Sequence, residues 1–163
     1  MDFALSEEQQ AFVDTARQFM EKELAPKAAE WDANSHFPVD VIKASGALGF
    51  CGLYTPEAAG GMGLSRLDSS LVFEELSKGC VSTTAFITIH NMATWMIASF
   101  ANEAVRDEWV PVLASGEKLA SYCLTEPNAG SDAASLTTSA RRDGDDYVLN
   151  GAKAFISGAG STD

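Results

Sequence analysis

The stretch Tyr122–Asp132 holds the small, polar and backbone-shaping residues that could bind a ligand. It reads Tyr-Cys-Leu-Thr-Glu-Pro-Asn-Ala-Gly-Ser-Asp and overlaps an apolar run, 118–124, that predicts a short strand. A strand that gives way to short polar residues exposes backbone N–H groups and hydroxyls, which suit a phosphate or the polar edge of a planar heterocycle. Pro127 fixes its own backbone, and Gly130 lets the chain approach a ligand closely. Taken alone, such a stretch is more often an ordinary loop after a strand.

Other residues capable of chemistry have a simpler structural interpretation. His90 lies in an apolar segment, where a single histidine is more often a hydrogen-bonded core residue than a ligand. Glu74 and Glu75 are adjacent in a predicted helix, so we expect one at the buried edge and one in solvent. The sequence has no Ser-His-Asp set, no H-E-x-x-H motif and no Cys/His cluster. Hydrolytic and metal-dependent chemistry are therefore disfavoured, and we predict no metal ligand.

Apolar spacing predicts the helices that must position the polar stretch. Ser6 and Gln9 form a capping-box pattern ahead of a helix that ends near 24–26. Further helices are expected from 38 onward and over 67–79, 82–101 and 102–116. Segment 82–101 approaches the length of a membrane span, about 20 residues. His90, Asn91 and several hydroxyl residues interrupt it, which favours a helix buried inside a bundle.

The sequence changes character after Leu119 and favours strands. Segments 136–140, 147–149 and 154–156 predict strands, and Arg-Asp-Gly-Asp-Asp over 142–146 predicts a hairpin turn. The predicted fold class is α+β, with an all-α helical domain over 1–117 and the start of an antiparallel β-barrel-like middle domain over 118–163. About 45 residues are too few for a closed barrel, so we expect the chain to be the front part of a longer protein.

Composition limits the classes of partner and compartment. The 163 residues are 46% hydrophobic and carry a net charge of −12, which argues against nucleic acid or an anionic membrane as a partner. Cys51, Cys80 and Cys123 are odd in number and widely spaced, which indicates a reducing compartment. The N-terminal residues resemble neither a signal peptide nor a transit peptide. We therefore expect the cytoplasm of a bacterium, or the mitochondrial matrix for a mature organellar form.

Two motifs resemble those of a known family. Cys123–Ser135 reads Cys-Leu-Thr-Glu-Pro-Asn-Ala-Gly-Ser-Asp-Ala-Ala-Ser and is similar to the signature of the acyl-CoA dehydrogenase flavoproteins. Asn150–Gly158 falls where that family has its second flavin-contacting strand. The resemblance spans nearly the whole chain and implies FAD as cofactor, with Ser131 and Leu124 also contacting the acyl-CoA substrate. The implied cofactor-binding residues are Tyr122, Cys123, Leu124, Thr125, Gly130, Ser131, Phe155, Ile156 and Ser157.

The resemblance also implies a reaction, the α,β-dehydrogenation of an acyl-CoA thioester. In the family, whose enzymes are homotetramers, a glutamate removes the α-proton and hydride passes to the flavin. The electrons then pass to a separate partner, the electron-transfer flavoprotein. That glutamate belongs to a C-terminal helical domain, whereas Glu126 and Asp132 are structural in the family. We therefore predict no catalytic residue within this chain, and expect residues 1–163 alone to be inactive.

Segments 79–92, 120–127 and 153–160 most resemble the branch that acts on short branched acyl groups. Phe155 and Ser157 stand where many relatives carry Trp and Thr, and both can keep the same contacts with the flavin. The implied floor of the acyl pocket is Ala85, Thr88, Ile89 and Met92, with ordinary core packing as an equal alternative. Two other functions stay open: a different acyl preference, and a non-enzymatic helical interaction module that keeps the fold.

Overall fold

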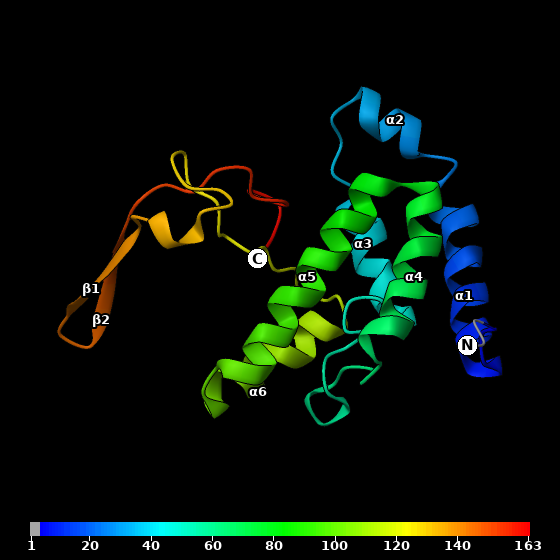
Figure 1. The fold of residues 1–163 in the computed structure, drawn as a ribbon, viewed down its shortest axis with the longest axis horizontal. Coiled ribbons are helices and arrows are strands. Elements are labelled where there is room, and N and C mark those ends of the chain that lie inside the picture. Colours follow the sequence, from blue (N-terminus) through cyan, green and yellow to red (C-terminus); the bar gives the residue numbers. More distant parts are fainter. Residues whose placement is uncertain (1–3) are drawn as a thin grey trace.

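The computed structural model describes residues 4–163 as a helical bundle from which a β-hairpin projects (Figure 1). The expectation about the N-terminal leader rests partly on residues 1–3, which lie outside the described residues. The helices are α1 (Glu7–Phe19), α2 (Ala28–Ala33), α3 (Val39–Ser45), α4 (Arg66–Gly79), α5 (Val81–Phe100) and α6 (Glu103–Ala114). The strands are β1 (Ser139–Asp143) and β2 (Asp146–Asn150). This arrangement confirms the predicted α+β class.

The first helix begins at the predicted capping box. The backbone N–H of Gln9 donates to Ser6 Oγ at 3.1 Å, and the Ser6 N–H donates to Gln9 Oε1 at 3.1 Å. Both bonds satisfy groups that a helix N-terminus otherwise leaves without partners. After α1 the chain continues as a π-helical turn, Met20–Leu24, which ends where the helix was predicted to end.

The bundle encloses one hydrophobic core, and α1 packs on α4 beside it. Glu75 of α4 is 6% exposed and accepts hydrogen bonds from Arg17 of α1 and from Lys78, whereas Glu74 is exposed. This confirms the predicted contrast between the two acids. The core residues are Ala16, Phe19, Met20, Leu24, Ile42, Phe50, Leu53, Val72, Leu76, Phe86, Ile87 and Leu119.

Helix α5 is the long apolar helix that the sequence predicted within the bundle. One face is buried and includes His90, whose two ring nitrogens both have hydrogen-bond partners, so its interpretation as a satisfied core histidine is confirmed. Asn91 is also fully buried and bonds to the backbone of Phe50, Leu53 and Ile87. Within residues 4–163, no helix has both the length and the hydropathy needed to cross a bilayer.

The hairpin joins β1 to β2 in antiparallel register, with Ser139 opposite Asn150 and Asp143 opposite Asp146. Gly144 has a φ of 65°, and the following Asp145 keeps a negative φ, which is the pattern of a tight two-residue hairpin loop that begins with glycine. The predicted hairpin turn is confirmed. Every residue of both strands is exposed, and Figure 1 shows the hairpin well away from the helices.

Three predicted strands are wrong in whole or in part. Segment 118–124 forms no strand: two of its N–H groups bind side chains instead, since Leu119 donates to the Asp163 carboxylate and Ala120 donates to His90. Segment 154–156 forms none, because Phe155 has a φ of 56°, outside the strand region. Of segment 136–140, only Ser139 and Ala140 join β1.

Candidate functional site

The two sequence motifs, Cys123–Ser135 and Asn150–Gly158, lie side by side, although residues 136–149 separate them in the chain. The backbone N–H of Ala154 donates to the carbonyl of Thr125 at 2.9 Å. Lys153 Nζ donates to the carbonyl of Leu124 at 2.9 Å, and Ser121 Oγ donates to the carbonyl of Ser157 at 2.7 Å. The segments 122–131 and 155–157, which contain all the predicted cofactor-binding residues, therefore form one continuous surface.

A tight turn shapes the first segment. Glu126 and Ala129 exchange two backbone hydrogen bonds, of 2.9 and 3.1 Å, with Pro127 and Asn128 at the tip. The proline ring suits the second position of a β-turn because its φ is already fixed. The turn sends the chain on to Gly130, where a Cβ atom would meet nothing within 4 Å. This open space lets the backbone of Gly130 approach a ligand.

Hydrogen-bond donors remain free along this surface while neighbouring acceptors are used. Among the described residues, the backbone N–H groups of Leu124, Thr125, Gly130 and Ser131 donate to no protein acceptor, although the Leu124 and Thr125 carbonyls are occupied. The hydroxyls of Thr125, Ser131 and Ser157 also make no hydrogen bond within 4–163. Such an array suits a ligand rich in acceptors, as are the carbonyl-bearing edge of a flavin and a phosphate.

Phe155 is the most unusual side chain of the surface. It is 95% exposed, and its φ of 56° lies in the left-handed region that bulky residues seldom adopt. A residue held in this region costs about 1–3 kcal/mol, and such strained residues cluster at functional sites. Phe155 therefore fits a planar ligand. Ile156 beside it is half-buried, and so are Tyr122 and Leu124, while Cys123 is an exposed free thiol.

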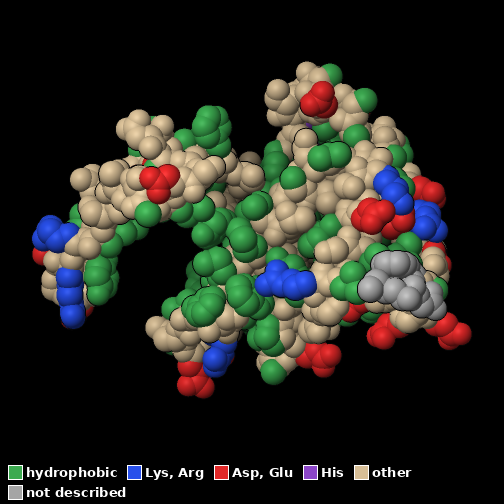
Figure 2. Space-filling model, viewed as in Figure 1, with side chains coloured by type: hydrophobic (Ala, Val, Ile, Leu, Met, Phe, Trp, Pro, Cys, Tyr) green, Lys and Arg blue, Asp and Glu red, His purple; other side chains and the backbone are tan. Residues whose placement is uncertain are grey.

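The residues predicted to floor an acyl pocket lie on the outward face of α5. Ala85 is exposed, and Thr88, Ile89 and Met92 are half-buried, whereas the buried face of α5 is made of other residues. The structure thus places all four outside the hydrophobic core, which argues against the ordinary-core interpretation. Figure 2 shows hydrophobic side chains on both sides of the hollow between the helical part and the hairpin.

The site is joined to the core through Gly158, which follows the second segment. A Cβ atom at Gly158 would lie 2.6 Å from Cε2 of Phe86, a core ring of α5, so only glycine fits there. The aromatic ring of Phe86 packs edge-on against Phe37 at 4.8 Å between centroids. The second segment therefore packs against the core in addition to its hydrogen bonds with the first segment.

Sequence reasoning missed the residues that hold the two segments together. The motifs did not single out Lys153 or Ser121. Lys153 donates to the Leu124 carbonyl of the first segment, and Ser121 donates to the Ser157 carbonyl of the second. Ser121 lies just before the first motif. The available signal was the position of Lys153 inside the second motif, since a lysine within an otherwise small and apolar motif needs a buried partner. The partner itself is 27 residues away in Glu126 and could not be read from spacing.

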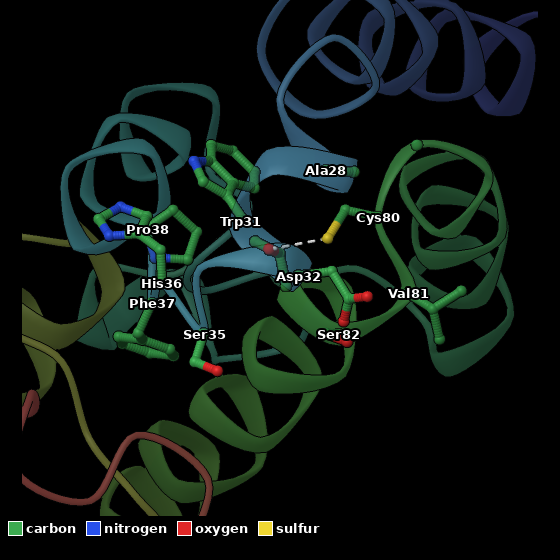
Figure 3. A pocket seen from close by; sticks show the side chains of 12 residues that line it. Ala28, Trp31, Asp32, Ser35, His36, Phe37, Pro38, Cys80, Val81 and Ser82 are labelled. Carbon is green, nitrogen blue, oxygen red and sulfur yellow. Dashed lines mark hydrogen bonds between the residues drawn. The ribbon is translucent and has the colours of Figure 1, made fainter.

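A cavity of about 430 Å³ lies elsewhere, between α2 and the start of α5 (Figure 3). Trp31 and Phe37 line it, and the Cys80 thiol and Thr83 hydroxyl at its edge lie 3.1 Å apart. It contains none of the predicted site residues. Among residues 4–163, no group of three or more His, Cys, Asp or Glu side chains could hold a metal ion.

Comparison with known proteins matches both parts of the chain. Residues 6–117 match the acyl-CoA dehydrogenase N-terminal domain, and residues 121–163 match the middle domain of the same family. The mitochondrial isobutyryl-CoA dehydrogenase of Bos taurus is 55% identical over 159 residues, which are 98% of this chain and 38% of that relative. These matches confirm the resemblance drawn from the motifs.

Solved structures share the fold at the same partial coverage. A structure from work on the electron transferring flavoprotein of Acidaminococcus fermentans has a TM-score of 0.92 and 39% identity, over 100% of this chain and 43% of that one. A glutaryl-CoA dehydrogenase from Mycobacterium smegmatis in complex with FADH2 has a TM-score of 0.93 and 31% identity, over 98% of this chain and 41% of that one. The chain thus spans well under half the length of each.

Proposed function

Because this chain belongs to the acyl-CoA dehydrogenase family, we propose that the full-length protein binds FAD and oxidises a short branched acyl-CoA thioester to its α,β-unsaturated product. The free donors of Leu124, Thr125, Gly130 and Ser131 beside the exposed ring of Phe155 carry this proposal. The name of the bovine relative supports isobutyryl-CoA as the first substrate to test, and the complex with FADH2 supports the cofactor.

The residues of the site divide into two kinds of contact. The N–H groups of Leu124 and Thr125 and the hydroxyls of Thr125 and Ser157 are proposed to donate to acceptors on the isoalloxazine edge, and Phe155 to supply a flat apolar surface. Tyr122, Cys123 and Ile156 complete the cofactor contacts by their position within the same two segments. Bound FAD would supply the acceptor for the two electrons of the oxidation.

Ser131 and Leu124 are proposed to contact the acyl-CoA as well, and the outward face of α5 to bound its acyl group. Ala85, Ile89 and Met92 give this face an apolar character, and Thr88 keeps its hydroxyl on the Ala85 carbonyl at 2.7 Å. A short branched acyl group therefore meets an apolar surface without a free polar group at that point.

We assign the catalytic base to neither Glu126 nor Asp132, which are structural in the family that the motifs resemble. Glu126 already accepts four hydrogen bonds, and Asp132 accepts one from the Ser135 hydroxyl. We therefore assign proton abstraction to a residue outside this chain and expect residues 1–163 alone to show no turnover. Steady turnover by the 163-residue chain, above the enzyme-free blank, would contradict this assignment.

Three further properties of the full-length protein are part of the proposal. Electrons leave through an electron-transfer flavoprotein, which the shared fold with the Acidaminococcus fermentans structure supports. The protein forms a homotetramer, as the family resemblance implies. It works in the mitochondrial matrix if organellar, as the name of the bovine relative suggests, or in the cytoplasm of a bacterium.

The deciding experiment purifies the full-length protein and measures its visible absorption and its activity toward a panel of acyl-CoA esters. We expect a yellow protein with bound FAD and highest kcat/KM for isobutyryl-CoA. A colourless protein that takes up no FAD on reconstitution would favour the non-enzymatic interaction module. A yellow protein that prefers a straight or longer chain would keep the reaction and change the substrate.

A further inference from the structure

One carboxylate beside the site is saturated with hydrogen bonds. Glu126 Oε2 accepts from the Thr137 N–H at 2.7 Å and the Thr137 hydroxyl at 2.9 Å. Its Oε1 accepts from the Thr138 N–H and from Lys153 Nζ, both at 2.9 Å. A carboxylate has about four lone-pair sites, so every acceptor position is used. Glu126 is 5% exposed, and the arrangement leaves it no capacity for a ligand.

The donors to Glu126 come from both ends of the hairpin. Thr137 and Thr138 immediately precede β1, and Lys153 follows β2 by three residues. Glu126 itself lies between the free donors of Thr125 and Gly130. Its carboxylate is therefore the point where the first site segment, the entrance of the hairpin and the exit of the hairpin meet.

Lys153 connects this point to the site in a second way. Its ammonium lies 2.9 Å from Glu126 Oε1 and 2.9 Å from the Leu124 carbonyl, and its side chain is 25% exposed. The next residue, Ala154, donates its N–H to the Thr125 carbonyl. Lys153 thus bridges two points of the first segment, and it stands two residues before Phe155. Charge-assisted hydrogen bonds of this kind are stronger and more directional than neutral ones.

We propose that Lys153 is a positioning residue, which acts through Glu126 and the Leu124 carbonyl to hold the free donors of 124–131 at a fixed distance from Phe155 before any ligand binds. The inference rests on the proposed function, since it takes these donors and this ring as the two sides of the flavin site. It assigns Lys153 no contact with the cofactor or the substrate. A preorganised site binds more tightly because its residues are ordered before the ligand arrives, so binding does not bear the free-energy cost of ordering them.

The alternative role is purely structural, in which Lys153 stabilises the fold and leaves the site unaffected. The two roles differ in their consequences for a folded variant. A positioning role predicts that FAD affinity falls while the helical bundle keeps its stability, because within residues 4–163 the Lys153 ammonium bonds to Leu124 and Glu126 and to no helix. A structural role predicts a lower melting temperature with an unchanged FAD affinity.

The test compares three variants of the full-length protein. Lys153→Met keeps the apolar stem and removes the charge, Lys153→Arg keeps a charged donor that can reach two acceptors, and Arg141→Met is the matched control. Arg141 makes an exposed ion pair with Asp143 at 3.5 Å inside the hairpin, away from both site segments. The readouts are FAD affinity by fluorescence quenching, the visible flavin spectrum, the melting temperature, and amide hydrogen exchange of 122–131 without FAD.

We expect Lys153→Met to weaken FAD binding by about tenfold or more, the loss typical of a charge-assisted hydrogen bond, and to speed exchange over 122–131. Lys153→Arg should recover most of the affinity, and Arg141→Met should change neither. An unchanged FAD affinity in a folded Lys153→Met variant would overturn the proposal, and so would unchanged exchange over 122–131. If the wild-type protein binds no FAD, the proposed function fails, while the exchange data still decide whether Lys153 orders the segment.

Discussion

The imidazole Nδ1 of His90 accepts a hydrogen bond from the backbone N–H of Ala120 at 3.0 Å. Its Nε2 lies 2.9 Å from the Leu113 carbonyl at the end of α6. The Ala120 amide can only donate and the Leu113 carbonyl can only accept, so the ring is neutral with its proton on Nε2. A fully buried side chain of α5 thereby fixes the backbone two residues before Tyr122, where the site begins.

This pairing makes stability depend on pH near neutrality. Burial lowers the pKa of His90 from its usual 6.5, and the hydrogen bonds to Leu113 and Ala120 oppose that shift only in part. Above pH 6.5 the ring is neutral in both states. Below it the unfolded chain takes up a proton that the folded chain does not, so the free energy of unfolding falls with falling pH, by up to about 1.4 kcal/mol per unit.

Urea unfolding at pH 7.5 and pH 5.5 measures this dependence. His90→Gln should flatten the part of the pH dependence that comes from this ring, and should cost about 1–3 kcal/mol at neutral pH because buried backbone groups lose partners. His36→Gln, at an exposed position, is the matched control for the substitution itself. Identical pH profiles for the wild-type protein and His90→Gln would contradict the neutral buried ring.

Ser131→Ala should weaken binding of FAD or of the CoA ester by about tenfold or more, because a hydrogen bond to a charged ligand group is worth about 1.5–3 kcal/mol. Calorimetric titration with each ligand measures the effect. Ser139→Ala removes a hydroxyl from the exposed hairpin and serves as the control. Wild-type affinity for both ligands in Ser131→Ala would remove Ser131 from the site.

Phe155→Gly should lower FAD affinity without lowering stability. Glycine adopts a φ of 56° without strain, and the exposed ring buries little, so the free energy of unfolding should stay level or rise by up to about 1 kcal/mol. FAD affinity should fall, because the flat contact surface is lost. Thermal melts without ligand and fluorescence titration with FAD separate the two effects. A large loss of stability would show that the Phe155 ring packs against the fold instead.

Ile89 and Ile87 offer a matched pair on α5, one on the outward face and one fully buried. Ile89→Ala should extend the accepted acyl length with little loss of stability, because it removes bulk from the face of α5 that we propose bounds the acyl group. Ile87→Ala should cost about 2–5 kcal/mol and leave the order of substrate preference unchanged. The measurements are kcat/KM over a series of acyl-CoA esters and urea unfolding. An unaltered preference in Ile89→Ala would remove this face from the acyl pocket.

Local signals predicted the parts of the fold that local interactions determine. Ser6 and Gln9 are three residues apart, and Gly144 sets its own turn, so both features were predicted correctly. The strands expected over 118–124 and 154–156 failed because Ala120 bonds to a side chain 30 residues away and because Phe155 leaves the strand region. Apolar composition alone cannot distinguish a strand from an extended segment held by such distant partners.

The same limit applies to the site. The motif residues could be identified from their resemblance, since they are contiguous. The pairing of Glu126 with Lys153 could not, because the intervening hairpin brings them together over 27 residues. The position of Ala85, Thr88, Ile89 and Met92 outside the core also needed the structure, since their apolar character suits a core and a pocket equally.

The exposed hairpin has a mechanical consequence for the site. It is attached at Thr138 and Gly151, where a Cβ atom at Gly151 would lie 2.2 Å from Thr138 Oγ1, so the two ends leave little slack. Any motion of β1 and β2 relative to the bundle therefore also moves Glu126 and Lys153, which lie at the base of the hairpin. Further strands paired along the edge of the hairpin would restrict this motion. The donors that flank Glu126 would then fluctuate less.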